Sequence, residues 1–247
     1  LVDMPKDVQM DKCSVDWDVA MDLPGYKIKT PTAQPEQIRQ IAAAIKHSRR
    51  PIIYCGGGVI LAEASEDLRK LIKATGIPTT MTVMGLGLYP NDGPLSLDML
   101  GMHGAAYANY AVRDCDLLIA LGVRFDDRVT GKLEAFAKNA KIIHVDIDAS
   151  EINKNKVAHI PICSDVKFAL QELNKIVEAP EDISEWTKHC QELKQKYAFK
   201  YDEAYDGILQ QHAIRELSNL TQDRETYITV GVGQHQMWAA QFYNFRK

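Results

Sequence analysis

The sequence lacks the features that mark a membrane-spanning or nucleic-acid-binding protein. Its longest apolar runs, such as residues 117–121, are far shorter than the roughly 20 residues that cross a bilayer. Basic residues are not in excess, because 29 Lys and Arg stand against 33 Asp and Glu and give a formal net charge of -4. Polyanion binding needs clustered positive charge. We therefore expect a soluble protein whose partners include neither a membrane nor a nucleic acid.

Cysteine is scarce and scattered. The five cysteines lie far apart in the chain, form no Cys-x-x-Cys pair and are odd in number. This pattern is typical of a reducing compartment, and it argues against both a disulfide framework and a zinc site. The sequence therefore predicts no metal site from its cysteines.

Short apolar runs alternate with helical stretches along the middle of the chain. Five runs are expected to be strands, and they lie at residues 52–55, 77–83, 117–121, 142–146 and 160–163. Each run is continuously apolar rather than alternating, which indicates a parallel sheet covered on both faces by helices. The expected helices include one from Pro35, a short one over 131–137 and one over 165–177. The sequence predicts an α/β fold with a doubly wound parallel sheet.

Composition divides the chain into three expected segments. Residues 1–33 are expected to be the end of a preceding domain and a linker, because proline and glycine break any periodicity there. Residues 34–178 are expected to form the middle domain. Residues 179–247 are expected to contain linker helices, including one over 182–198, and then a strand at Tyr227 to Val230 that begins a further α/β domain.

In open parallel sheets, ligands bind beyond the carboxyl ends of the strands, so the turns after the strands are where a site is expected. Gly56 to Gly58 follow a strand and precede a helix, which allows a diphosphate to approach the backbone. A tight turn explains these glycines equally well. The connection from Gly85 to Gly104 is a second candidate, because long structured loops are usually functional. This connection contains His103, and a single histidine of this kind is more often a structural group than a catalyst.

Charged residues follow two further strands. A carboxylate at Asp146 or Asp148 can accept hydrogen bonds from ribose hydroxyls, although a helix cap is an alternative, above all for Asp148. Residues 122–128 hold two cations and two carboxylates and suit a charged ligand, although such a cluster is more often a solvated ion-pair network. No nucleophile lies at a recognisable spacing from a base and an orienting acid. The residues alone indicate a nucleotide-cofactor-binding α/β domain.

Three strings carry a resemblance to a known family. The first includes Met84-Gly85-Leu86-Gly87 and continues through 97–104, the second covers 122–133, and the third is Gly-Gln-His-Gln-Met-Trp at 233–238. Together and in this order they resemble the acetolactate synthase (acetohydroxyacid synthase) family of thiamine diphosphate-dependent enzymes. The resemblance covers essentially the whole chain and is poorest between about residues 178 and 225.

The resemblance implies a transferase that uses thiamine diphosphate and magnesium. Such an enzyme decarboxylates pyruvate and joins the two-carbon unit to a second 2-oxo acid, pyruvate or 2-oxobutyrate, on the way to branched-chain amino acids. The thiamine cofactor carries the carbanion chemistry, and the protein supplies binding and orientation. The resemblance also implies an FAD in the middle domain with no net role in the reaction, a homo-oligomer, a regulatory subunit, and a bacterial cytoplasmic or plastid location.

The resemblance also implies site residues of three kinds. The FAD positions are Gly57, Thr82, Val83, Leu100, Gly101, Met102, His103, Gly122, Val123, Arg124, Phe125, Asp126, Asp146, Ile147, Asp165 and Val166. The positions that approach the diphosphate end of the thiamine cofactor are Gln234 and His235. The positions that line a channel for herbicidal inhibitors are Met102, Asp127 and Arg128.

Parts of the family pattern are expected outside this sequence. The chain opens without an initiator Met and closes soon after the third string. The family's glutamate that activates the thiamine ring is expected before Leu1, and its Gly-Asp-Gly and Asn metal-binding motif after Lys247. We therefore expect no catalytic residue here and no acetolactate formation by these 247 residues alone.

Other functions remain as alternatives. Another thiamine diphosphate carboligase or oxidase shares the fold of the middle domain, but the third string disfavours it. A flavin or nicotinamide oxidoreductase would exchange electrons between its cofactor and a substrate. A sirtuin-like deacylase would need a zinc-binding cysteine set, which the sequence lacks. A non-enzymatic binding module is a further alternative, and it applies if the chain is an excised fragment.

Overall fold

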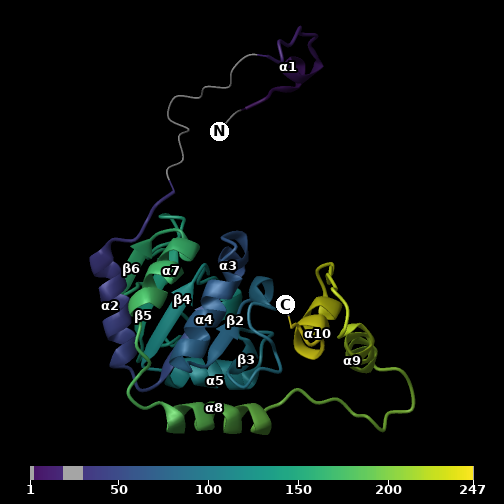
Figure 1. Cartoon of the computed structure of the whole chain (residues 1–247). Helices are drawn as coiled ribbons and strands as arrows, with labels where there is room; N and C mark the ends of the chain where they lie inside the picture. Colours follow the sequence, from purple (N-terminus) through teal and green to yellow (C-terminus); the bar gives the residue numbers. More distant parts are fainter. Residues whose placement is uncertain (1–2, 19–29, 247) are drawn as a thin grey trace.

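A six-stranded parallel sheet forms the centre of the computed structural model, which describes residues 3–18 and 30–246 (Figure 1). The strand order is β3-β2-β1-β4-β5-β6, and every neighbouring pair is parallel. The strands are β1 (Pro51–Cys55), β2 (Thr79–Met81), β3 (Ser96–Met99), β4 (Leu117–Leu121), β5 (Lys141–Asp146) and β6 (Ile160–Cys163). The prediction of a doubly wound parallel sheet is confirmed.

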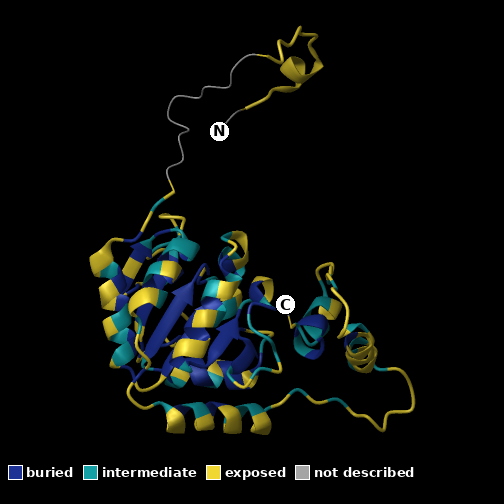
Figure 2. Cartoon of the chain, in the orientation of Figure 1, coloured by how far each residue is buried: buried dark blue, intermediate teal, exposed yellow. Residues whose placement is uncertain are grey.

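Helices cover both faces of this sheet. The helices are α1 (Lys6–Met10), α2 (Pro35–Lys46), α3 (Gly57–Leu61), α4 (Ser65–Thr75), α5 (Ala106–Asp114), α6 (Asp127–Thr130), α7 (Val166–Ile176), α8 (Ser184–Lys196), α9 (Gln210–Thr221) and α10 (Gln234–Phe242), with a 3₁₀ turn, η1 (Val83–Gly85). Helices α2, α4 and α7 pack on one face, and α5 and α8 cover the other. Figure 2 shows the strands as the buried interior between them.

Alternate residues of β1, β4 and β5 contribute to two separate hydrophobic cores. Ile53 and Cys55 of β1 point into the core beneath α2, α4 and α7, and Ile52 and Tyr54 into the core beneath α5 and α8. Burial of both faces explains why β1 and β4 are apolar at every position.

Local sequence signals set several helix ends. Pro35 opens α2 at a position where its missing N–H costs nothing, and Gln34 and Gln37 form a capping box there. Gly76 ends α4 in the left-handed conformation, with φ of 67°. The expected helix from Pro35 is therefore confirmed.

The structure corrects three expected elements, the first of them only in its bounds. The strand expected over 77–83 is only β2, because Pro78 has no N–H for the ladder and residues after Thr82 turn into η1. The helix expected over 131–137 is a series of turns, where Lys156 Nζ donates to the carbonyls of Leu133 at 2.9 Å and Phe136 at 2.7 Å. Those carbonyls would serve backbone donors in a helix.

The third error is the strand expected from Tyr227 to Val230. These residues pair with no strand in the described part of the chain. Strand β3, in contrast, was not expected, because Ser96 and Asp98 interrupt its apolar character. Residues 19–29 of the expected linker lie outside the described residues.

Helix α8 packs beside α5 and runs below it in Figure 1. The indole Nε1 of Trp186 donates to the carbonyl of Pro51 at 3.0 Å, and Cys190 is buried. The helix expected over 182–198 is thus confirmed, and it packs on the sheet.

Candidate functional site

The loops that follow β1 and β4 touch at the carboxyl edge of the sheet. The strand order reverses between these neighbours, since later strands add beside β4 and earlier ones beside β1. The backbone N–H of Gly58 donates to the carbonyl of Gly122 at 3.1 Å. A Cβ on Gly58 would lie 2.6 Å from the Cα of Gly122, so only glycine permits this approach. Such a reversal point is where open α/β sheets bind ligands.

Thr82 places an unsatisfied hydroxyl beside these glycines. Its backbone N–H donates to the carbonyl of Cys55 at 3.0 Å, which fixes the turn after β2. Its Oγ1 is buried and has no hydrogen-bond partner among the described residues. A buried hydroxyl without a partner costs about 1–3 kcal/mol. An oxygen-rich ligand at this edge would remove that cost.

The loop after β3 is joined to α6. Gly101 adopts φ of 104°, and the Asn109 side chain bonds both its N–H and its carbonyl at 2.9 Å. The N–H of Met102 donates to the carbonyl of Arg128 at 2.8 Å. Leu100 is buried, whereas the Met102 and His103 side chains are exposed. The structure therefore brings the predicted residues Gly101 and Met102 next to Arg128.

The loop after β4 presents its backbone rather than its apolar side chains. Val123 and Phe125 are each 3% exposed and belong to the core, so any contact with a ligand would come from their main chain. Arg124 is exposed. Asp126 caps α6 by accepting a hydrogen bond from the N–H of Arg128 at 3.1 Å.

The expected charge cluster is an exposed ion pair in this structure. The Arg128 guanidinium lies 3.4 Å from the Asp127 carboxylate, and both side chains are more than two-thirds exposed. An exposed pair of this kind contributes little stability. Both charges therefore remain accessible to a ligand.

The end of β5 combines a half-buried carboxylate with an exposed apolar side chain. Burial raises the pKa of Asp146 above its usual value, and the carboxylate accepts a hydrogen bond from the N–H of Asp148 at 2.9 Å. Ile147 is half exposed. Asp148 accepts hydrogen bonds from the N–H and hydroxyl of Ser150, but the residues after it form turns and no helix.

Asp165 and Val166 have structural tasks. The Asp165 carboxylate caps α7 by accepting a hydrogen bond from the N–H of Phe168 at 2.8 Å, and its own N–H donates to the carbonyl of Pro31. Val166 is buried. Together they tie the start of α7 to the segment that leads into α2.

Gln234 and His235 lie at the start of α10, and both are exposed. One link joins this helix to the edge loops: Gln241 Nε2 donates to the carbonyl of His103 at 2.8 Å. No hydrogen bond joins Gln234 or His235 to the loops after β1 and β4 in the described part of the chain.

The sequence did not reveal an apolar rim around this edge. The rim consists of exposed large hydrophobic side chains close to the ends of β1, β2, β3 and β5, and they are Ile60, Leu61, Val83, Met84, Met102 and Ile147. Exposed apolar groups beside a few polar ones are typical of a cofactor site. The run Val59-Ile60-Leu61 directly follows the three glycines, and it is the sequence signal that could have indicated the part of the rim formed by Ile60 and Leu61.

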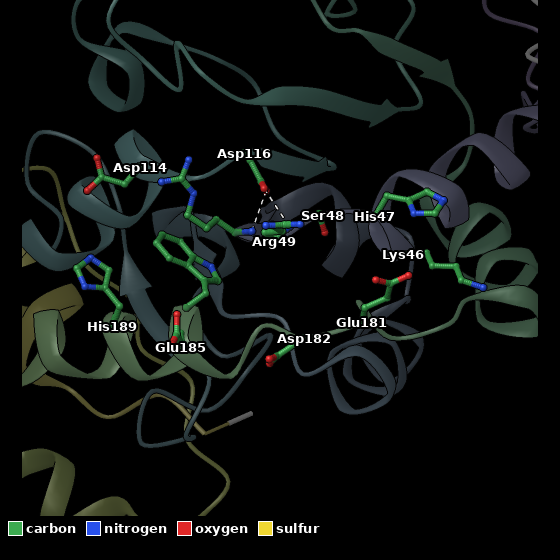
Figure 3. Close-up of a pocket in the computed structure, with 12 residues that line it drawn as sticks. Lys46, His47, Ser48, Arg49, Asp114, Asp116, Glu181, Asp182, Glu185 and His189 are labelled. Carbon is green, nitrogen blue, oxygen red and sulfur yellow. Dashed lines mark hydrogen bonds between the residues drawn. The ribbon is translucent and has the colours of Figure 1, made fainter.

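A large cavity lies at the opposite, amino edge of the sheet. It has a volume of about 940 Å³ and is lined by residues 46–50, by Asp114 and Asp116, and by residues near the start of α8 (Figure 3). The Asp116 carboxylate accepts hydrogen bonds from the N–H groups of Arg49 and Arg50, both at 2.9 Å. Charges of both signs line this opening, and it contains no residue of the carboxyl edge.

Neither a metal centre nor a membrane span is found in the described residues. Within 3–18 and 30–246, no three His, Cys, Asp or Glu side chains are grouped so that they could hold a metal ion. No helix of these ranges is long and apolar enough to cross a membrane.

Comparisons with known proteins give one family and a set of relatives. Residues 38–173 match the family described as "Thiamine pyrophosphate enzyme, central domain". The whole chain is 51% identical to acetolactate synthase 1, chloroplastic, of Nicotiana tabacum, and covers 38% of that protein. It is 50% identical to acetolactate synthase, chloroplastic, of Arabidopsis thaliana and covers 37% of it. The chain thus spans less than two-fifths of the length of these relatives.

Proposed function

Because the chain belongs to the thiamine pyrophosphate enzyme family and carries its central domain, we propose that it is the flavin-holding part of an acetolactate synthase. Such an enzyme decarboxylates pyruvate and joins the two-carbon unit to pyruvate or 2-oxobutyrate. The observation that carries the proposal is the 51% identity to a named acetolactate synthase over 100% of this chain. The similarity therefore includes every loop at the carboxyl edge of the sheet.

The residues of the carboxyl edge fit an FAD. The unpartnered Thr82 hydroxyl and the main chain of Gly57, Gly101 and 122–126 suit its diphosphate, and the Asp146 carboxylate suits a ribose. The apolar rim, with Val83, Met102 and Ile147, suits a planar ring system. We assign four further residues to this site, where they contact the FAD through their main chain or support these loops. They are Leu100, His103, Asp165 and Val166.

Two further roles belong to exposed residues. We assign Gln234 and His235 to the diphosphate end of thiamine diphosphate, which supplies the carbanion chemistry when bound. We assign Met102, Asp127 and Arg128 to an inhibitor channel, because the N–H of Met102 bonds the carbonyl of Arg128 and both charged side chains are exposed. No magnesium ligand is assigned among the described residues.

The names of the relatives also bear on location and assembly. The relatives are chloroplastic acetolactate synthases, so the proposed location is the plastid, with the cytoplasm as the alternative. A homo-oligomer and a regulatory subunit are part of the same proposal.

Titration of the purified chain with FAD tests the proposed site. We expect saturable binding, seen as a change in flavin fluorescence, and about tenfold weaker binding after Thr82→Val, which removes one hydroxyl. Thr79→Val is the matched control, because its buried hydroxyl donates to the carbonyl of Ile77 within the same stretch of chain. Equal loss of affinity in both variants, or no binding by the unchanged chain, would argue against the site.

A chimera tests the activity. Replacing the matching segment of the Nicotiana tabacum relative by this chain should leave an enzyme that forms acetolactate from pyruvate. A folded chimera that binds thiamine diphosphate but forms no acetolactate would contradict the proposed function.

A further inference from the structure

His144 is a fully buried histidine in the middle of β5, and it reaches the loop after β4. Its Nε2 lies 2.9 Å from the carbonyl of Val123. A carbonyl can only accept, so Nε2 carries the proton. Nδ1 then has the free lone pair of a neutral imidazole, and it has no partner among the described residues. Burial favours this neutral form by lowering the pKa of His144.

A second side chain holds the same loop two residues further on. Nδ2 of Asn155 donates to the carbonyl of Phe125 at 2.9 Å. The Phe125 ring packs edge-on against the His144 ring, with centroids 5.0 Å apart. His144 and Asn155 therefore bond two alternate carbonyls of the loop after β4, and both residues come later in the chain than this loop.

This arrangement determines which backbone groups the loop can offer. The carbonyls of Val123 and Phe125 are taken by side chains, and Gly122 starts the loop with φ of 57°. The N–H groups of Arg124 and Asp126 have no acceptor in the described part of the chain. A peptide plane holds the carbonyl of one residue and the N–H of the next, so fixing the carbonyls of Val123 and Phe125 also fixes the direction of these two N–H groups.

We infer that His144 and Asn155 are positioning residues of the proposed flavin site, and that they act through the carbonyls of Val123 and Phe125. This inference rests on the proposed function. A purely structural role would need only a buried side chain of the right volume at 144, and an apolar one would leave no unpaired nitrogen. Position 144 instead holds a donor aimed at a loop carbonyl.

Four variants of the full chain separate these roles. His144→Gln keeps a donor nitrogen, His144→Leu removes it, and Asn155→Ala releases the carbonyl of Phe125. His159→Leu is the matched control, because the His159 ring accepts the N–H of Ile142 at 3.0 Å, near the amino end of the same strand. Affinity for FAD, the thermal midpoint, and ¹⁵N NMR of the imidazole rings are measured.

The expected NMR result in the unchanged chain is a proton on Nε2 of His144 and an unprotonated Nδ1. For FAD binding, His144→Leu and Asn155→Ala should each weaken the affinity about tenfold, and His144→Gln and His159→Leu by less than about threefold. The thermal midpoint separates lost folding from lost positioning. Asn155 lies outside the core, so Asn155→Ala remains a test even if His144→Leu does not fold.

Two results overturn the inference alone: a proton on Nδ1 of His144, or unchanged affinity in His144→Leu and Asn155→Ala while the unchanged chain binds FAD. Absence of FAD binding by the unchanged chain refutes the proposed function instead, and the positioning role falls with it.

Discussion

At the residue scale, a few buried polar atoms and a few glycines distinguish the carboxyl edge of the sheet. The hydroxyls of Tyr54 and Thr82 and Nδ1 of His144 are buried without a partner in the described residues. Burial raises the pKa of the Tyr54 phenol and lowers the pKa of His144, so both stay neutral at pH 7. These atoms lie in or next to the loops at the carboxyl edge, which is why this edge is the candidate site.

The lowered pKa of His144 predicts how stability depends on pH. The unfolded chain takes up a proton near the ordinary value of 6.5, whereas the folded chain does so only at lower pH. The free energy of unfolding therefore falls as the pH drops from about 6.5 toward the folded pKa, by up to about 1.4 kcal/mol per pH unit. Urea unfolding of the unchanged chain and of His144→Gln, from pH 7.5 to 5, measures the difference between their slopes.

Asp146 has the opposite effect on the free energy of unfolding, which it raises as the pH drops. Its raised pKa lets the folded state bind a proton before the unfolded state does. Asp146 is present in both proteins, and His144→Gln removes only the charge of His144, which lowers the pKa of Asp146. Identical slopes for the unchanged chain and His144→Gln would show that His144 is not the group responsible.

Gly58→Ala tests the contact between the loops after β1 and β4. The added Cβ would meet the backbone of Gly122, which cannot rotate away as a side chain would, so we expect a loss of about 1–3 kcal/mol. Gly231→Ala is the control, with its nearest neighbour a side-chain atom of His235 at 3.5 Å, and an expected change within about 0.5 kcal/mol. Comparable urea midpoints for the two variants would mean that the loops separate easily.

At the scale of elements, the sequence predicted those strands whose burial is continuous. Strand β4 was predicted with the bounds that the structure has, because all five of its residues are apolar and both faces are covered. Strand β3 was not, since the Asp98 carboxylate looks unsuited to a buried strand. Its partners are Tyr107, which donates its hydroxyl, and Lys194, 96 positions further along the chain. The local sequence pattern does not indicate that Lys194 lies beside Asp98.

Lys194→Met tests whether α8 folds as one unit with the sheet. Lys194 Nζ lies 3.1 Å from the Asp98 carboxylate and also donates to the carbonyls of Asn91 and Ser96 at 2.9 Å. Its loss removes one donor from each of three acceptors, so we expect the free energy of unfolding to fall by about 1–3 kcal/mol.

The control lies on the same helix. Lys188 is exposed and 3.9 Å from Glu192, so Lys188→Met should change stability by less than about 0.5 kcal/mol. Equal effects of the two substitutions in urea unfolding would indicate that α8 is only loosely attached.

At the scale of the molecule, sequence reasoning predicted a site at the carboxyl edge of the sheet, but not which side chains there are buried and which are exposed. The glycines after β1 and the carboxylate after β5 were predicted from strand ends alone. The burial of Val123 and Phe125 and the exposure of Leu61 and Met84 depend on how distant elements pack, so no spacing rule reveals them. The cavity at the amino edge was not predicted either, because it forms where the start of α8 lies near residues 46–50, which are distant in the sequence.

The most direct test of the central claim is hydrogen–deuterium exchange of the chain with and without FAD. The account predicts that FAD slows exchange in the loops after β1, β2 and β4, at residues 56–59, 82–86 and 122–127. Exchange at residues 46–50 and 181–189, around the cavity at the amino edge, should stay unchanged. Protection confined to the amino edge, or no protection at all, would contradict a flavin site at the carboxyl edge of the sheet.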